Sequence, residues 1–205
     1  MVAATDKVFS RIPGTDHPSL DGKIYISTGY DTLSNALAQS GWKSVTANNV
    51  PEQKNRTYAH TPYMYSGGER GGPMATYLVS ATARPKFKLW LKTSVSKIVR
   101  TGGHATGVEV EAFLDGGYSG TVNLTPGTGR VIVSAGAFGT AKLLLRSGIG
   151  PTDQLEVVQA SADKSTMINS TQWINLPVGY NLDDHLNVGL TTDLVRPGLT
   201  SIRLI

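Results

Sequence analysis

Residues 130–150 read RVIVSAGAFGTAKLLLRSGIG, and this stretch decides the fold. Residues 131–133 are β-branched, as in strands that are buried on both faces of a parallel sheet, and three small residues follow where the strand ends. Residues 140–146 have an apolar helical pattern that ends in a basic residue, and Gly148 follows where a left-handed helix cap is expected. The stretch predicts a buried strand, a tight turn and a short helix.

The turn between this strand and helix is a candidate cofactor edge. Ligands of open α/β sheets collect at the carboxyl ends of the strands, so Ser134, Ala135 and Gly136 predict a place where a flat group approaches the backbone. Small residues at such a turn also serve packing alone. The pattern by itself leaves both interpretations open.

The amino-acid sequences of several stretches resemble one family. Residues 136–150 closely resemble the second signature of the glucose-methanol-choline family of flavin oxidoreductases, in which the Ser-Gly-Ile-Gly ending is specific. Other stretches are similar to the flavin domain of fungal cellobiose dehydrogenases: FSRIPGTD at 9–16, NRTYAH at 55–60, GGER at 67–70 and WINLPVGYNLDDH at 173–185. The resemblance extends over roughly residues 4–190.

The resemblance implies an enzyme that acts on CH–OH groups with FAD as the hydride acceptor. Its substrate is expected to be a cellobiose-type disaccharide, oxidised at the anomeric hydroxyl to the lactone. Haem is expected only on a separate cytochrome domain, which accepts the electrons unless an external acceptor does. The full-length protein is expected to be secreted and extracellular.

The resemblance also implies which residues hold the cofactor. The main chain of Val95 is expected at the adenine edge, and Ser134, Ala135 and Gly136 beside the adenosine half of FAD. The glycine-rich dinucleotide loop and the catalytic His of the relatives match no stretch of this sequence. No catalytic residue is therefore assigned, and the 205 residues alone are expected to be inactive.

The expected fold class is α/β with α+β character. Residues 1–150 are interpreted as the middle of a Rossmann-like FAD-binding domain with a β-meander, and residues 151–190 as the start of a substrate-binding domain. Residues 191–205 do not resemble the family and are interpreted as an atypical, artefactual tail. Periodicity predicts helices at 3–9, 23–40, 74–83 and 154–160, and strands at 87–92, 95–99, 108–111 and 118–124.

Composition excludes some classes of partner and site. The net charge is +4, but the basic residues are spread along the chain, which argues against nucleic-acid binding. No apolar run approaches the roughly 20 residues that span a bilayer, so no membrane partner is expected. The chain has no cysteine, and the consecutive residues Asp183, Asp184 and His185 seldom converge on one ion, so no metal is expected.

Three sequons, at Asn55, Asn123 and Asn169, weakly favour secretion. Two other functions stay open at this point. The chain is part of another family member, such as a glucose or aryl-alcohol oxidase, or it is a non-enzymatic domain that reuses the same sheet.

Overall fold

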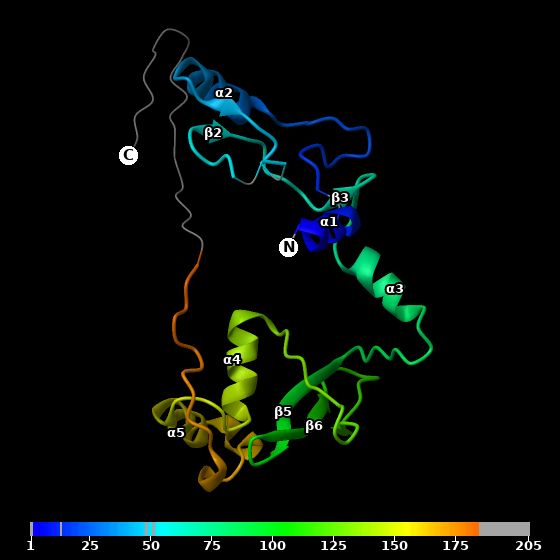
Figure 1. Ribbon diagram of the computed structural model, residues 1–205, viewed down its shortest axis with the longest axis vertical. Helices are drawn as coiled ribbons and strands as arrows, with labels where there is room; N and C mark the ends of the chain where they lie inside the picture. Colours follow the sequence, from blue (N-terminus) through cyan, green and yellow to red (C-terminus); the bar gives the residue numbers. More distant parts are fainter. Residues whose placement is uncertain (1, 13, 48, 51, 185–205) are drawn as a thin grey trace. The chain divides into compact units, whose positions relative to one another are not determined.

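The computed structural model describes residues 2–12, 14–47, 49–50 and 52–184, and the chain forms two compact units. The first unit ends at Leu89 and the second begins at Trp90 (Figure 1). Helices and small sheets occur in both, which confirms the predicted class of α/β with α+β character. The predicted boundary at residue 150 separates functional domains rather than compact units, and it stays a prediction. The interpreted tail, residues 191–205, lies outside the described residues.

The first unit combines helices with two-stranded sheets. The predicted helix at 3–9 is confirmed as α1, and the one at 23–40 forms only from Thr28, ending before Gly41, whose φ of +79° allows the chain to turn away. Strand β1 pairs in parallel with β2, and β3 pairs antiparallel with β4. The elements are α1 (Val2–Arg11), α2 (Thr28–Gln39), β1 (Lys43–Ser44), β2 (Thr57–Tyr58), β3 (Tyr65–Ser66), β4 (Glu69–Arg70), the π-helical turn η1 (Met74–Leu78) and α3 (Val79–Thr82).

The glycine-rich stretch at 67–72 begins with a hairpin turn. Gly67 and Gly68, with φ of +58° and +80°, form the two-residue turn of the β3–β4 hairpin. Two consecutive positive φ values are what a tight hairpin turn requires, and glycine adopts them without a steric penalty. A Cβ at Gly68 would also come within 2.9 Å of the Leu20 Cβ, so this turn has to be glycine for a second reason.

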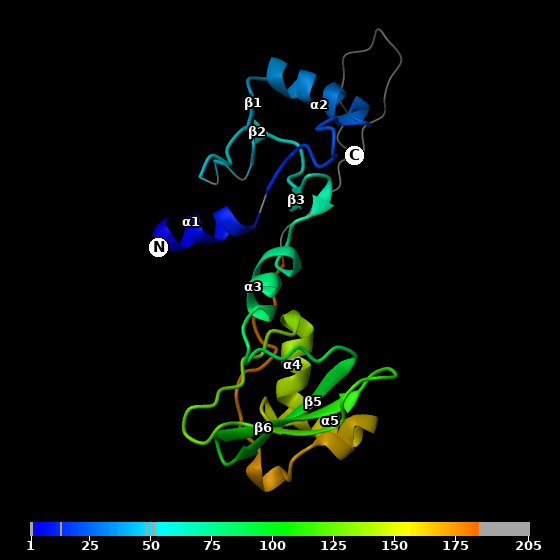
Figure 2. The ribbon, with the colours of Figure 1, turned by 90° about the vertical axis from the view of Figure 1, so that its right-hand side faces the viewer.

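The second unit is built on an antiparallel meander. Its strands are β5 (Thr93–Thr101), β6 (His104–Ala112) and β7 (Gly120–Asn123), in the order β5-β6-β7. Figure 2 shows β5 and β6 running side by side, and α4 packs against β5. The meander confirms the strands predicted at 95–99, 108–111 and 118–124, whereas the strand predicted at 87–92 does not form. Its alternating side chains, among them Leu89 and Leu91, are exposed.

Helices close one side of the meander. They are α4 (Gly136–Arg146), α5 (Thr152–Ala160) and the 3-10 turns η2 (Ala162–Thr166) and η3 (Ser170–Gln172). Apolar core residues among those described are Ile98, Val110 and Leu155, and the last is fully buried. The Ile98 N–H donates to the Ser147 hydroxyl at 2.8 Å, which ties the edge of β5 to the end of α4.

The prediction that residues 131–133 form a buried parallel strand is wrong for the described structure. The segment is extended but belongs to none of the described sheets, and the Ile132 side chain is 87% exposed. A parallel strand needs neighbouring strands for its N–H and C=O groups and covering helices for its side chains. None of the described strands pairs with this segment.

Candidate functional site

A cavity of about 860 Å³ lies in the second unit, between the start of β5, the extended segment at 130–135 and one face of α4. Val95, Ser134 and Ala135 line it, so three of the four residues expected to hold the cofactor meet at one place. Gly136 is not part of the lining and begins α4 directly after it. That these residues contact a cofactor stays a prediction.

The hydrogen-bonding pattern of β6 determines which way the neighbouring strands face. The Phe113 N–H donates to the Lys92 carbonyl at 2.8 Å, and the Leu124 N–H donates to the Thr106 carbonyl at 2.8 Å. Between residues 107 and 112, odd-numbered residues of β6 therefore direct their main chain to β5 and even-numbered residues to β7, because the pattern alternates along a strand. Val110 is one of the residues that face β7.

Val95 lies opposite Val110 in the register, so its own N–H and C=O point away from β6, to the outer edge of the sheet. Ile98 faces the same edge, as its bond to Ser147 shows. The two residues share an edge although they are three apart, because the extra residue at Ser96 forms a β-bulge. An edge with both a donor and an acceptor can pair with adenine, which also carries one of each.

Gly136 is required by its backbone conformation rather than by crowding. Its φ is +77°, in the left-handed region, and a Cβ at this position would meet nothing within 4 Å. Glycine lets the chain turn from the extended segment into α4 within one residue. The Ala135 N–H donates to the Thr140 hydroxyl at 3.2 Å across this turn.

The cavity lining is positively charged. Arg130, Lys142 and Arg146 line it, and no Asp or Glu is among its lining residues. Arg146 forms an ion pair with Asp163 at 2.5 Å, which lowers the pKa of that carboxyl chiefly through the hydrogen bond. The Arg146 Nε is buried without a hydrogen-bond partner in the described part of the chain. A lining with three cationic side chains and no carboxylate suits an anionic ligand.

Sequence reasoning missed these cations. Lys142 and Arg146 are four residues apart, the spacing that places two side chains on one face of a helix, so the signal was present in α4. Gly139 and Leu143 lie on the same face and also line the cavity. Only the position of the helix beside β5 turns that face into a site.

The Ser-Gly-Ile-Gly ending contributes to packing. Gly148 has a φ of +71°, as predicted for a helix cap, and a Cβ there would overlap the Ile168 side chain. A Cβ at Gly150 would overlap the Leu145 side chain. Residues 148–150 lie beside residues 174–176 in a parallel bridge, with the Ile174 N–H donating to the Gly148 carbonyl at 2.9 Å.

The candidate metal segment gives no site within the residues that the structure describes. Asp183 and Asp184 are exposed, and His185 lies outside the described residues. No cluster of three potential metal ligands occurs among the described residues.

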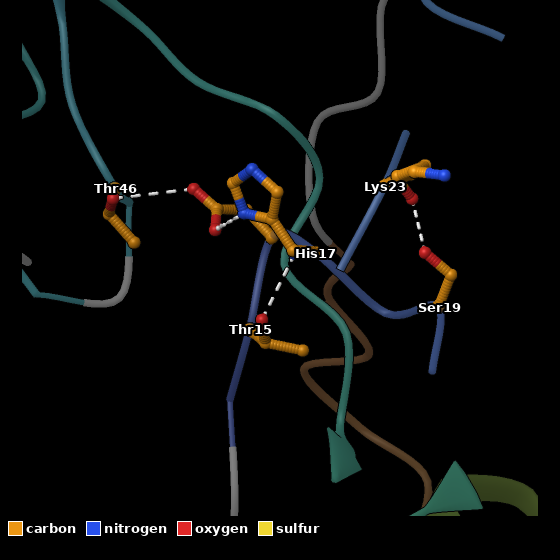
Figure 3. A network of polar contacts seen from close by, with 6 residues as sticks. Thr15, His17, Ser19, Lys23 and Thr46 are labelled. Carbon is orange, nitrogen blue, oxygen red and sulfur yellow. Dashed lines mark hydrogen bonds and ion pairs between the residues drawn. The ribbon is translucent and has the colours of Figure 1, made fainter. Parts of the chain in front are cut away.

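Two histidines of the first unit have side-chain partners. His17 Nδ1 lies 2.7 Å from the Asp16 carboxylate, whose pKa is lowered chiefly by that hydrogen bond. The Thr46 hydroxyl also donates to this carboxylate at 3.4 Å, so the network links two segments of the first unit (Figure 3). His60 stacks on Tyr30 with ring centroids 3.4 Å apart. These contacts lie within the first unit, and they explain both histidines by local structure.

Most of the chain is similar to known proteins. The family model described as GMC oxidoreductase matches residues 20–187. The chain belongs to this family. Among curated relatives, an oxygen-dependent choline dehydrogenase of Brucella anthropi is 30% identical over 183 residues, 86% of this chain and 30% of the relative. The corresponding enzyme of Sinorhizobium medicae is 35% identical over 121 residues, 58% of this chain and 19% of the relative.

A solved structure supports the fold. An FAD-dependent oxidoreductase from Chaetomium thermophilum is similar over 65% of this chain and 22% of its own, with a TM-score of 0.53 and 24% sequence identity. This chain spans about 30% of the length of the curated relatives that it matches over 86% of its own length. Among the described residues, no helix has the length and apolar character needed to cross a bilayer.

Proposed function

We propose that the complete protein oxidises a CH–OH group with FAD as cofactor, and that this chain supplies the part that holds the adenosine half of FAD. The observation that carries the proposal is the meeting of the outward main chain of Val95, the small residues Ser134 and Ala135, and a cationic helix face around one cavity. Family membership supports the same assignment.

The residues of this chain would hold FAD in three ways. The Val95 N–H and C=O would pair with the adenine edge, and Ser134 and Ala135 would leave room for the adenosine to lie against the backbone. Lys142, with Arg146, would attract the pyrophosphate, since a cationic lining favours an anion. Bound FAD supplies hydride acceptance from the carbon that bears the hydroxyl.

For the substrate we propose a cellobiose-type disaccharide that is oxidised at the anomeric hydroxyl to the lactone. The support is the resemblance of residues 9–16, 55–60 and 173–185 to the flavin domain of cellobiose dehydrogenases. Under this proposal the protein is secreted, and its electrons pass to a haem-bearing cytochrome domain or to an external acceptor. The 205 residues alone are expected to be inactive.

A second candidate substrate is choline or a related amino alcohol. The curated relatives that match this chain over 86% of its length are named oxygen-dependent choline dehydrogenases. Assay of the complete protein with cellobiose, glucose, an aryl alcohol and choline, each with an artificial electron acceptor, separates the candidates. Turnover of choline without turnover of cellobiose would replace the disaccharide proposal, and turnover of none of the four would overturn both.

The role of Val95 has a direct test. In the complete protein, Val95→Pro removes the outward N–H, whereas Val95→Ala keeps it and shortens only the side chain. Proline is tolerated on an edge strand whose N–H faces outward, so the fold is expected to persist. The loss of one hydrogen bond, about 1 kcal/mol, predicts about a fivefold weaker retention of flavin in Val95→Pro than in Val95→Ala.

Flavin absorbance of the purified protein measures that retention, and circular dichroism confirms folding. Equal flavin content in the two variants, both folded, would show that the Val95 main chain does not contact the cofactor.

A further inference from the structure

The three sequons of the chain are folded in three different ways, and only one of them joins its two key side chains. Asn169 begins the 3-10 turn η3, where its Oδ1 accepts hydrogen bonds from the Thr171 N–H at 3.0 Å and from the Thr171 hydroxyl at 2.9 Å. Both residues are exposed. Within the described residues, no group accepts a hydrogen bond from the Asn169 side-chain nitrogen.

The other two sequons lack this contact. At Asn55, the following Arg56 has a left-handed φ of +52°, and the Thr57 hydroxyl donates instead to the Gln53 carbonyl at 3.2 Å. Asn123 lies in β7 and pairs with Gly107 of β6. No hydrogen bond joins its side chain to that of Thr125 in the part of the chain that the structure describes.

The contact in η3 matters for the chemistry of the amide. A hydrogen bond donated to Oδ1 draws electron density from the amide and makes its N–H protons more acidic, which favours loss of one proton when the nitrogen forms a new bond. The turn is also held from within the unit, because the Arg100 guanidinium donates to the Gln172 carbonyl at 2.5 Å. The Asn169 side chain is therefore held in one position, is exposed, and has an amide N–H made more acidic by the contact.

We propose that Asn169 is the N-glycan acceptor of this protein, in preference to Asn55 and Asn123. The donor is a lipid-pyrophosphate-linked oligosaccharide, used by an oligosaccharyltransferase. The Asn169 nitrogen forms a bond to the anomeric carbon, the bond from that carbon to the pyrophosphate oxygen breaks, and the lipid pyrophosphate leaves with the electron pair. The amide proton passes to a base of the transferase.

The inference rests on the proposed secretion but not on the proposed oxidation chemistry. The test uses the natural gene product with a secretion signal in a yeast host. Glycosidase release in heavy-oxygen water marks each formerly modified Asn as Asp, and peptide mass spectrometry then reads the three sequons separately. The medium and the cell extract are both analysed, so retention in the cell does not hide the result.

The expected result is modification at Asn169, with the peptides of Asn55 and Asn123 unmodified. Asn169→Gln and Thr171→Ala should each abolish the glycosidase-sensitive mass shift, whereas Thr171→Ser should keep it, and Asn55→Gln and Asn123→Gln should not change it. An unmodified Asn169, or equal modification of all three sequons, would overturn the proposal. Flavin content and turnover measured on the same sample report separately on the proposed function.

Discussion

Replacement of Arg100 tests what holds α4 against the meander. Arg100 exposes only 8% of its surface, and its guanidinium donates to four main-chain carbonyls. The Nε donates to the Ser147 carbonyl at 3.1 Å, and Nη2 donates to that of Gly148 at 3.2 Å and that of Gln172 at 2.5 Å. The Nη1 donates to the Gly102 carbonyl at 2.6 Å. One side chain thus joins β5 to the end of α4 and to η3.

The cost of Arg100→Met follows from where the four carbonyls lie. Ser147 and Gly148 are buried, so water does not replace the lost arginine bonds. The Ser147 carbonyl is left unsatisfied at about 1–3 kcal/mol, whereas the Gly148 carbonyl keeps the bond from the Ile174 N–H and loses one charge-assisted bond, about 1.5–3 kcal/mol. Gln172 and Gly102 are exposed, and water takes over their bonds at little cost. Burial lowers the pKa of the Arg100 guanidinium by desolvation, so removal of the charge returns part of the loss. The expected net loss is about 2–4 kcal/mol, a large part of the 5–15 kcal/mol of a typical protein.

Hydrogen exchange of the complete protein measures this loss locally. The Ile174 N–H, which donates to the Gly148 carbonyl, is a suitable reporter. The protection factor of this amide in Arg100→Met is expected to decrease by about 30-fold to about 700-fold, because each 1.4 kcal/mol corresponds to a factor of about ten. Lys164→Met is the matched control, since Lys164 is exposed in the same unit and its loss should change stability by at most about 0.5 kcal/mol. Equal protection in the two variants would refute the reasoning.

Three further changes have defined outcomes. Gly148→Ala is expected to destabilise the second unit by about 2–4 kcal/mol in urea unfolding, through its left-handed φ and the overlap of the new Cβ, whereas Gly102→Ala, with a similar φ and open space, should cost about 1 kcal/mol; equal losses would contradict this. The hydrogen bond from Arg146 lowers the folded-state pKa of Asp163, so the ionised carboxylate stabilises the fold above about pH 4, and this stabilisation is lost as pH falls further. In Asp163→Asn the free energy of unfolding should therefore differ less between pH 6 and pH 3 than in the unmodified protein. An unchanged pH profile would contradict this role of Asp163. Lys142→Glu places an anion at the cavity and should weaken flavin binding about tenfold in fluorescence titration of the complete protein, while Lys164→Glu should leave it unchanged.

Local patterns were enough to predict most of the second unit. The period of two in residues 108–111 and the apolar helical spacing in 140–146 depend only on near neighbours in the chain, and both elements form. Gly148 is predicted as a left-handed cap because it closely follows the basic residue that ends the helical pattern, and its φ of +71° confirms this. That a Cβ there would overlap Ile168 depends on a segment 20 residues away, which no local pattern reports.

The failures share a physical cause. Residues 87–92 alternate like a strand, yet the alternation carries no information about whether a partner strand lies alongside. The hairpin at Gly67 and Gly68 went unrecognised because its two strands are only two residues long, too short for a periodic pattern. Val95 is predicted through resemblance, and its outward direction follows from its pairing opposite Val110, a feature of register that the sequence does not display.

The extended segment at 131–133 is expected to couple folding of the proposed site to ligand binding. It forms one wall of the cavity, but within the described residues no strand pairs with it, and Ile132 exposes 87% of its surface. A segment with few buried contacts opens at low free-energy cost. A ligand that binds only the closed arrangement stabilises that arrangement by mass action. We therefore expect flavin to increase the exchange protection of the amides of residues 131–133 more than that of the amides of β6, which already has strands on both sides. An equal increase in the two segments would show that this wall of the cavity is already formed without the ligand.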